Sequence, residues 1–432
     1  MAAAEHPGIT RFKEERDRFK ILYDFSQCSE DPEVRHAGWL ARLTSEARAG
    51  IVRAYEAGEP FIATNYCTAP EVAVAMDLPW FMLYEAPFLG ATPEPLQESL
   101  DATAAMGLSQ DLCAVHRSSI YAVEHGLVPV PTAAIGLLFP CDGLPMMHQV
   151  IRHSQSWRDV PMFSPDPPYF NDDRAVTYFA NELRKMAAFL ERHTGRRLEL
   201  DRLKAVIEEG EKQYRLWDEY NELRRAVPCP HGYEQGGVKC FAVTQCLKVG
   251  QPEGTQWFSQ LLELTERRVA QGIGPTPREK IRLFWFDLMP TSWAPEFMSW
   301  LEQEWGAVVV MDMQGDSGYS PIDTSSEEGM WLGLARRGLF ETPMMRQAVG
   351  PAESRLDELV RVIKDYKIDV VVWPNHMGHK ETQAVYGIIR ELCRELGVPI
   401  MDIGMDVFDN RYTTADEIKD KFTNFFRAMG LG

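Results

Sequence analysis

The sequence lacks the short motifs that mark many nucleotide-dependent and nucleophile-dependent enzymes. It contains no G-x-x-x-x-G-K-[ST] phosphate loop, no G-x-G-x-x-G dinucleotide fingerprint and no G-x-S-x-G nucleophile elbow. We therefore do not expect the chain to hydrolyse ATP, to bind NAD or to act as a serine hydrolase by these routes. None of its eight cysteines belongs to a C-x-x-C pair, so a local metal signature is also missing.

Long apolar runs are missing too. No run approaches the roughly 18 residues that would span a bilayer, and residues 1–20 are charged, with apolar positions too scattered for a signal peptide. The cysteines lack the dense, regular spacing of a disulfide scaffold, so reduced thiols or metal ligands are the default interpretation. We expect a soluble, cytoplasmic protein that does not contact a membrane.

Basic charge is scarce. The 45 Lys and Arg residues are outnumbered by 63 Asp and Glu residues, which gives a formal net charge of −18. A nucleic-acid-binding protein would show a basic stripe, so this class is disfavoured. A length of 432 residues with 45% hydrophobic residues is typical of a globular protein with two domains.

The order of predicted elements indicates an α/β protein. Residues 1–58 are predicted to be helical, residues 59–170 to form a first α/β domain, residues 171–275 to form a helical bridge and residues 276–432 to form a second α/β domain. In both α/β domains the strands alternate with helices, which is typical of parallel sheets. Strands are expected at 60–67, 79–86, 133–140, 160–164, 281–286, 307–311 and 370–373. The expected helices include one that has Ser109 as its N-cap and Cys113 in its first turn, and one that begins at 293.

The clearest unit lies at residues 368–404. A short β-branched and aromatic run predicts a buried strand, a polar turn carries His376 and His379, and the helix that follows is expected to end at Gly397, just before Pro399. A second buried strand completes a βαβ unit. Open α/β sheets bind their ligands at the carboxyl ends of strands, so this turn is a candidate site.

Three side chains occupy comparable positions at strand exits or helix starts: Cys113, Cys141 and His379. A helix N-terminus at Cys113 would favour a thiolate. Two thiolates and one imidazole from facing domains could hold iron or zinc. The alternative is that each is a buried or rim residue of a βα loop.

Other candidates lie near these positions. Thr64 and Glu71 follow the first strand, where Glu71 could complement a helix dipole or act as a general acid or base. Cys67 could line the same cleft. His116, Arg117 and His148 lie one turn from Cys113 and Cys141, where they could support the ligands or bind an anion, and Arg117 could equally make a surface ion pair. Cys393 is expected in the core, and Cys28 is expected to have no role. A separate zinc site is possible at Cys229, Cys240 and Cys246, but their spacing is not distinctive.

Several segments, taken together, resemble a known family. These are the run from Thr64 to Glu71, S-Q-D-L-C ending at Cys113, F-P-C-D around Cys141, and V-P-I-M-D-I-G-M-D-V-F-D-N-R-Y near the end of the chain. The sequence is similar to the benzoyl-CoA reductase and 2-hydroxyacyl-CoA dehydratase family, specifically to its iron–sulfur (B/C or D-type) subunits. The resemblance covers residues 37–429.

This resemblance implies two Rossmann-like domains facing a cleft, with a [4Fe-4S] cluster held by three cysteines. Cys113 and Cys141 match the first two, whereas His379 stands where the family has the third. Histidine can ligate cluster iron. His376 or Cys67 could fill the place instead, and the site could hold zinc or no metal. Glu71 matches a carboxylate that lines the family's substrate cleft, and with Thr64 it is the predicted catalytic pair.

The resemblance also implies partners and a reaction. Members form complexes with a homologous second subunit, receive electrons from an ATP-dependent activator protein, and reduce a CoA thioester through a ketyl radical. We therefore expect a cluster-bearing subunit of an acyl-CoA dehydratase or reductase. The alternative is a cluster-free or zinc-binding partner subunit for substrate binding or scaffolding. The sequence does not distinguish aromatic from aliphatic acyl groups, nor dehydration from reduction.

Overall fold

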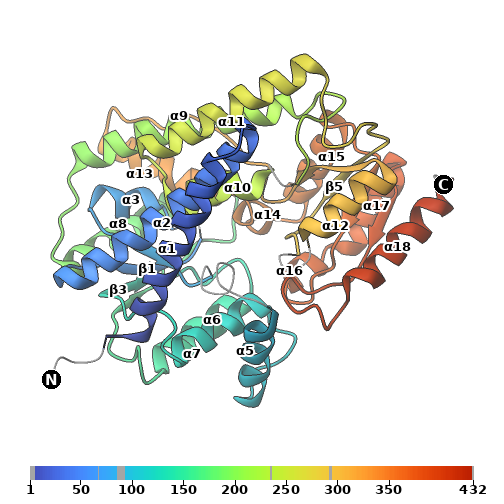
Figure 1. The fold of residues 1–432 in the computed structure, drawn as a ribbon. Helices are drawn as coiled ribbons and strands as arrows, with labels where there is room; N and C mark the ends of the chain where they lie inside the picture. The colour runs from blue at the N-terminus through green and yellow to red at the C-terminus, as the bar shows by residue number, and fades with distance from the viewer. Residues whose placement is uncertain (1–4, 67, 85–92, 234–235, 291–293, 431–432) are drawn as a thin grey trace.

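Two four-stranded parallel sheets form the framework of the molecule. The computed structural model describes residues 5–66, 68–84, 93–233, 236–290 and 294–430. The strand orders are β2-β1-β3-β4 and β6-β5-β7-β8, so the two sheets repeat one topology and lie in separate halves of the molecule (Figure 1). The strands are β1 (Ile62–Thr64), β2 (Trp80–Met82), β3 (Ala133–Ile135), β4 (Met162–Phe163), β5 (Ile281–Trp285), β6 (Ala307–Asp312), β7 (Val370–Trp373) and β8 (Ile400–Asp402). The predicted α/β fold with two parallel-sheet domains is confirmed.

Helices cover both faces of the first sheet, because successive side chains of each strand point to opposite sides. Ala63, Phe81 and Ala134 face one core and Ile62 and Ile135 face another. The first core includes α1 (Pro7–Gln27), α2 (Pro32–Ala57), α5 (Pro93–Ala105), α6 (Ala114–Glu124) and α7 (Gly143–His153). The second core includes α3 (Pro70–Ala75), α8 (Asp173–Thr194) and α13 (Glu327–Arg336).

The second sheet is covered in the same way. Leu283 and Trp285 face one side and Phe284 and Phe286 face the other. The first side packs against α12 (Ala294–Trp300), the π-helical turn η3 (Leu301–Trp305) and α18 (Ala415–Ala428). The opposite side packs against α15 (Glu353–Asp365) and α17 (Tyr386–Leu396). All residues of β5, β6 and β7 are buried, which explains their continuous apolar runs.

Two long helices of the predicted bridge, α9 (Leu200–Leu223) and α11 (Pro252–Gln271), run side by side across one edge of both halves (Figure 1). Trp217 and Trp257 pack between them. Trp217 Nε1 and Asn221 Nδ2 also donate to the carbonyl of Gly315, beyond β6, at 3.2 and 2.9 Å. The bridge is therefore tied to the second half as well as to the first. In the sequence, α10 (Gly237–Ala242) and the π-helical turn η2 (Val243–Leu247) come between α9 and α11.

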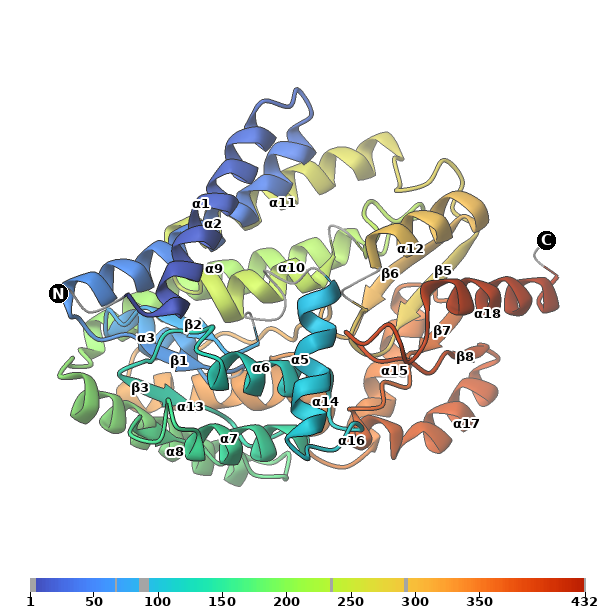
Figure 2. The same ribbon diagram turned by 60° about the horizontal axis from the view of Figure 1, so that its bottom comes forward.

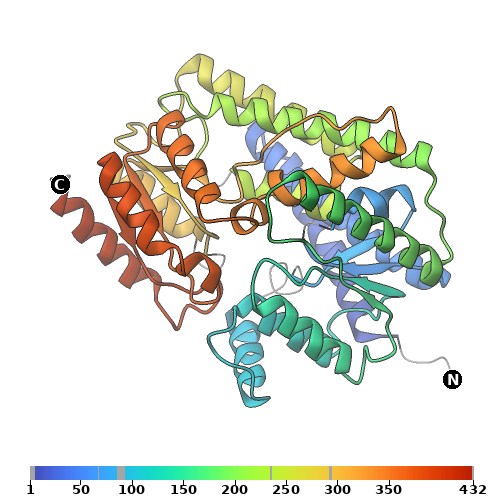
Figure 3. The ribbon, with the colours of Figure 1, turned by 180° about the vertical axis from the view of Figure 1, so that it is seen from behind.

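Two helices pack against the first sheet although the predicted boundaries place them outside the first α/β domain. The prediction assigns α8 to the helical bridge and α13 to the second α/β domain, but both pack under the first sheet, side by side (Figure 3). The two elements after α13 also contribute to this second core. They are η4 (Arg337–Glu341) and α14 (Met345–Ala348). An amphipathic pattern predicts that a helix has a buried face, but it does not determine which sheet that face packs against.

Helix α5, which the sequence analysis does not predict, lies between the two halves (Figure 2). Gln97 Nε2 donates to Asn410 Oδ1 at 3.1 Å, and Asp101 pairs with Arg411 at 2.9 Å. The hairpin formed by α1 and α2 projects from the first half in the same view (Figure 2). No helix in the described part of the chain is long and apolar enough to cross a membrane.

Two predicted helix ends can be compared with the structure. Helix α17 ends at Gly397 with a φ of 69°, as predicted. The helix expected to begin at Ser109 instead begins at Ala114, with Cys113 at the N-cap, because the Ser109 hydroxyl bonds to Asp111. The short α16 (Lys380–Gln383) precedes α17. Residues 85, 86 and 293, at the ends of a predicted strand and a predicted helix, lie outside the described residues.

Candidate metal centre

The site lies where each sheet reverses its strand order. The reversal falls between β1 and β3 in the first sheet and between β5 and β7 in the second. Cys141 follows β3, Asp287 follows β5, and His376 and His379 follow β7. Doubly wound sheets bind ligands at such switch points. The topology therefore brings polar side chains to the functional edge of both sheets.

A close backbone contact joins the two halves at this point. A Cβ atom at Gly378 would lie 2.5 Å from both Cα and Cβ of Cys113, so only glycine allows the approach. The turn after β7 therefore rests directly on the N-cap of α6. This contact sets the positions of the histidines on either side of Gly378 relative to the Cys113 thiol.

Cys113, His376 and His379 form one buried group. Their ligand atoms all lie within 4.8 Å of one another. His376 Nε2 is 3.3 Å from Cys113 Sγ, and the two imidazole rings are 4.5 Å apart with an interplanar angle of 75°. The structure thus brings together two of the predicted ligands, Cys113 and His379. It also adds His376, which the sequence analysis treats only as an alternative.

Each imidazole has an acceptor at its outer nitrogen. His379 Nδ1 lies 2.7 Å from Asp287 Oδ1. His376 Nδ1 lies 3.4 Å from the Met405 carbonyl and 3.8 Å from Asp406 Oδ2. Donation from Nδ1 in both rings leaves Nε2 as the nitrogen available to a ligand.

The two aspartates are themselves fixed by the backbone. Asp287 Oδ1 accepts a hydrogen bond from Leu288 N at 2.7 Å. Asp406 Oδ1 accepts from Phe408 N and from Asp409 N, both at 2.8 Å. Both carboxylates are buried. Neither aspartate is among the predicted site residues, although Asp287 follows a predicted strand directly and Asp406 belongs to the segment that carries the family resemblance.

The protonation of this group follows from burial and from the aspartates. Burial and the neighbouring His379 lower the pKa of His376 to about 4. Burial also opposes a charge on His379, but the Asp287 carboxylate outweighs it and raises the pKa of His379 to about 9. Burial and Asp406 raise the pKa of the Cys113 thiol well above its usual value. The expectation of a thiolate favoured by the helix N-terminus is therefore wrong, since desolvation of the buried Cys113 thiol is the larger effect on its pKa.

Cys141 is nearby but has a different partner. Its Sγ lies 3.1 Å from His116 Nε2, and burial raises its pKa to about 12. Burial and the positive potential of neighbouring histidines lower the pKa of His116 to about 3. A neutral thiol and a neutral imidazole therefore pair in the first half. Among the described residues, the converging group does not include Cys141.

A cavity of about 360 Å³ opens next to this group. Cys113, Cys141 and His379 all contribute to its wall, so the three predicted ligands share one chamber. The rest of the wall is mainly apolar and aromatic, with the side chains of Lys239 and Gln314 among its few polar contributions. We call this cavity the chamber. Apolar walls with a few polar groups are typical of small-molecule sites.

The predicted catalytic pair does not belong to the described wall of the chamber. The Thr64 hydroxyl lies 2.8 Å from Thr68 Oγ1 and is buried in the first half. Glu71 Oε1 lies 3.9 Å from Arg337 Nη1, with both side chains 3% exposed. Both residues contact small pockets elsewhere in the molecule. A direct catalytic role for Thr64 and Glu71 remains a prediction that this geometry does not support.

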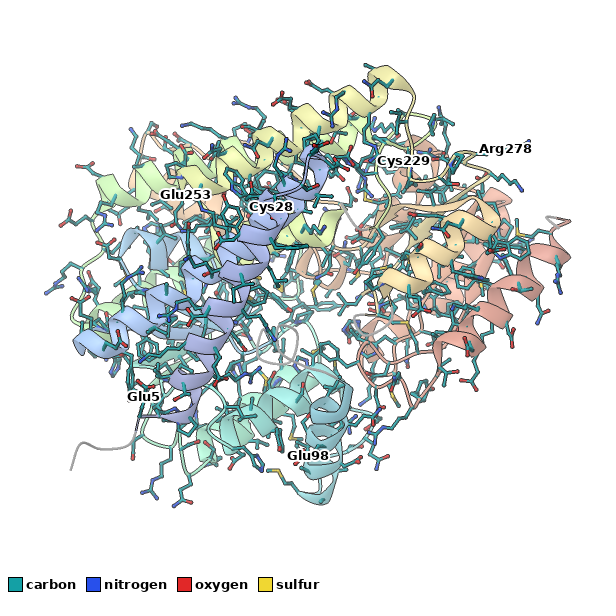
Figure 4. The ribbon with its side chains drawn as sticks, viewed as in Figure 1. Glu5, Cys28, Glu98, Cys229, Glu253 and Arg278 are labelled. Atoms are coloured by element: carbon teal, nitrogen blue, oxygen red, sulfur yellow. The ribbon has the colours of Figure 1, made fainter. Side chains whose placement is uncertain are left out.

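The remaining candidates have separate positions. Cys393 is buried in the core under the second sheet, as predicted. The Cys229 thiol donates to the His231 carbonyl at 3.1 Å, and Cys28 is exposed at the end of α1; both are labelled in Figure 4. Cys240 is buried among aromatic rings near α9, whereas Cys246 contributes to the chamber. Cys67 lies outside the described residues.

Residues 65–429 match the family model described as 2-hydroxyglutaryl-CoA dehydratase, D-component. No curated protein matches the chain. The matched range includes Cys113, Cys141, His376 and His379, and it begins one residue after Thr64.

Proposed function

Because the chain belongs to the family of the 2-hydroxyglutaryl-CoA dehydratase D-component, we propose that it is the subunit of an anaerobic acyl-CoA dehydratase complex that receives the acyl group of a 2-hydroxyacyl-CoA. The acyl group enters the chamber, and the Cys113–His376–His379 group lies at the chamber wall. The observation that carries this proposal is the coincidence of the chamber with a buried group of potential metal ligands.

The chamber suits an acyl group for two reasons. Its wall includes Met82, Leu144 and Phe241, whose apolar surfaces favour a hydrocarbon chain over water. Lys239 and Gln314 supply hydrogen-bond donors that can orient a thioester carbonyl or a hydroxyl group. Exclusion of water would also protect reactive intermediates of the acyl group.

The family resemblance implies a [4Fe-4S] cluster on three cysteines, and the described residues do not fit this group. The wall of the chamber offers Cys113, Cys141 and Cys246, but Cys246 comes from η2 rather than from the turn after β7, where the third family cysteine belongs. Cluster ligands bind separate iron atoms and lie farther apart than the ligands of one ion. The close approach of Cys113 to His376 and the pairing of Cys141 with His116 do not support the predicted set of Cys113, Cys141 and His379.

These contacts favour the second predicted function, a cluster-free or zinc-binding partner subunit. In that arrangement this chain binds and orients the substrate beside a homologous subunit. The electrons for one-electron (ketyl radical) chemistry come from an ATP-dependent activator protein. The absence of a phosphate loop in this chain is consistent with a separate activator.

Acyl-CoA binding tests the proposal. The full-length protein, kept oxygen-free, is titrated calorimetrically with a 2-hydroxyacyl-CoA, and one thioester is expected to bind per chain. Ala242→Trp places an indole in the chamber wall and should weaken binding at least about 10-fold, because it fills space that the acyl group needs.

The matched control is Ala270→Trp, which adds the same side chain at an exposed position of α11. It should leave the affinity unchanged. Absence of thioester binding to the wild-type protein, or equal losses in the two variants, would contradict the proposal.

A further inference from the structure

We infer that Cys113, His376 and His379 bind a single zinc ion, and that Asp287 and Asp406 orient the two imidazoles toward it. The assignment of the ion to the chamber of an acyl-CoA enzyme rests on the proposed function. The ligand set itself rests on the geometry of five buried side chains.

One pair of ligand atoms has the spacing expected around a single ion, and the third ligand atom lies nearby. Tetrahedral zinc with a Zn–S bond of about 2.3 Å and Zn–N bonds of about 2.0–2.1 Å holds its ligand atoms about 3.4–3.6 Å apart. Cys113 Sγ and His376 Nε2 are 3.3 Å apart, and all three ligand atoms lie within 4.8 Å of one another. Thiolate and imidazole ligands together are typical of zinc sites.

The outer contacts of the histidines support the same assignment. Metal-bound histidine usually donates its second N–H to a carboxylate or a backbone carbonyl, which fixes the ring and its tautomer. His379 has Asp287 at 2.7 Å, and His376 has the Met405 carbonyl at 3.4 Å with Asp406 behind it at 3.8 Å. Both rings therefore present Nε2 inward. A histidine pair that served only to fill the core would not need two buried carboxylates, which are costly to desolvate.

One side of the proposed zinc site is open to the chamber. His376 is fully buried behind the group, whereas Cys113 and His379 line the chamber. Three protein ligands with a fourth position open to a cavity are characteristic of catalytic rather than structural zinc sites. An ion here could polarise the carbonyl of a bound thioester as a Lewis acid.

Charge balance also favours a cation at this position. The carboxylates of Asp287 and Asp406 bring negative charge into one buried region directly behind the ligand group. A divalent cation offsets most of this charge. Cys141 is not required, because its thiol, which also lines the chamber, already pairs with His116.

Cobalt titration tests the ligand set. The full-length protein is stripped of metal by a chelator under reducing conditions and titrated with Co²⁺, a spectroscopic substitute for Zn²⁺. We expect saturation at one Co²⁺ per chain, with a thiolate-to-cobalt charge-transfer band and visible bands of four-coordinate cobalt, and we expect Zn²⁺ to displace it. Cys113→Ser should remove the charge-transfer band, and His376→Ala and His379→Ala should each abolish tight binding. Cys141→Ser is the matched control and should keep both the band and the stoichiometry.

A variant that leaves all three ligands in place keeps the test valid if the ligand variants fail to fold. Asp287→Asn preserves the side-chain shape and should weaken Co²⁺ binding by about 10- to 100-fold, the usual cost of losing an outer carboxylate. Asp172→Asn at the exposed start of α8 changes the net charge equally and should have no effect.

Three outcomes would overturn the zinc site. These are a wild-type protein that binds no Co²⁺, a Cys141→Ser variant as damaged as Cys113→Ser, and iron with acid-labile sulfide in protein purified without oxygen. The titration contains no CoA thioester, so its failure would leave acyl-CoA binding to its own test. Failure of acyl-CoA binding would likewise leave the ligand set intact.

Discussion

The two α/β halves share one strand order but differ in the chemistry at their switch points. In the first half, Cys141 follows the third strand and pairs with the imidazole of His116, and no carboxylate of the described residues forms a hydrogen bond with either side chain. In the second half, His379 follows the corresponding strand and pairs with Asp287 at 2.7 Å. The first pair is neutral, whereas the second is an ion pair in the metal-free protein because the pKa of His379 is raised to about 9.

The strand order determines where the polar residues lie, whereas the side chains determine whether the site can hold a cation. The repeated strand order brings a polar residue to the same edge of each sheet. The second half adds the buried carboxylates of Asp287 and Asp406 beside its imidazoles, and these turn a strand exit into a group that can hold a cation. The first half instead contributes the Cys113 thiol and more of the described lining residues of the chamber than either the bridge or the second half. The centre is thus a product of the contact between the halves rather than of either half alone.

The largest expected effect comes from removing the charged partner in the second half. Asp287→Ala leaves His379 without its carboxylate in a buried site, and it should lower the free energy of unfolding of the metal-free protein by about 4 kcal/mol. Cys141→Ala removes only a neutral pair in the first half and should cost about 1 kcal/mol. Urea unfolding at pH 7 measures both. Equal losses would remove the distinction between the two switch points.

The second effect concerns the glycines of the two strand-exit turns. Gly378→Ala places a methyl group 2.5 Å from the backbone of Cys113, which cannot move without shifting α6, and should cost about 3 kcal/mol. Gly143→Ala meets the imidazole of His116 at 2.2 Å, a side chain that can rotate away, and should cost less. Thermal unfolding checks the order. A larger loss for Gly143→Ala would show that the first turn is the tighter of the two.

Much of this arrangement is predictable from sequence, because strand and helix signals are local. The buried runs of β5, β6 and β7, and the stop at Gly397, follow from residue type and spacing. The positions of Cys113, Cys141 and His379 at strand exits or helix starts are predictable for the same reason. The helical pattern alone did not locate the first residue of α6, since Ser109 bonds to Asp111 instead of capping the helix.

The remainder depends on contacts between residues far apart in the sequence. The choice of His376 over Cys141 as a neighbour of Cys113 follows from the approach of Gly378 to α6, which no local pattern encodes. The roles of Asp287 and Asp406 likewise follow from the way that β5 and the segment after β8 meet the turn after β7. The packing of α13 under the first sheet is a third example. In each case the sequence predicts the element but not its partner.

The third prediction concerns acid. Burial lowers the pKa of His148, a first-half residue, from 6.5 to about 4. Above pH 6.5 neither the folded nor the unfolded state binds this proton; as pH falls toward 4, the unfolded state binds it first and stability is lost. The loss should reach about 2 kcal/mol at pH 5, since one pKa unit is worth about 1.4 kcal/mol. His148→Gln should flatten the decline in urea midpoint between pH 6.5 and 5, and His153→Gln, at an exposed position on the same helix, should not. Parallel declines in both variants would mean that other groups govern acid sensitivity.

The smallest expected effect is at the surface, where charge also links the two halves. Lys380 Nζ lies 2.9 Å from Asp142 Oδ2 and 3.1 Å from Asp111 Oδ2, so one second-half side chain reaches two first-half carboxylates. Because Lys380 is 41% exposed, Lys380→Ala should cost only about 0.5 kcal/mol, and the cost should vanish in 1 M salt, where the Debye length is about 3 Å. Arg394→Ala, which breaks an exposed pair with Glu391 inside one helix, is the matched control. A loss several times that of the control that disappears in 1 M salt would mean that surface charge, rather than the buried contact of Gly378 with Cys113, holds the halves together.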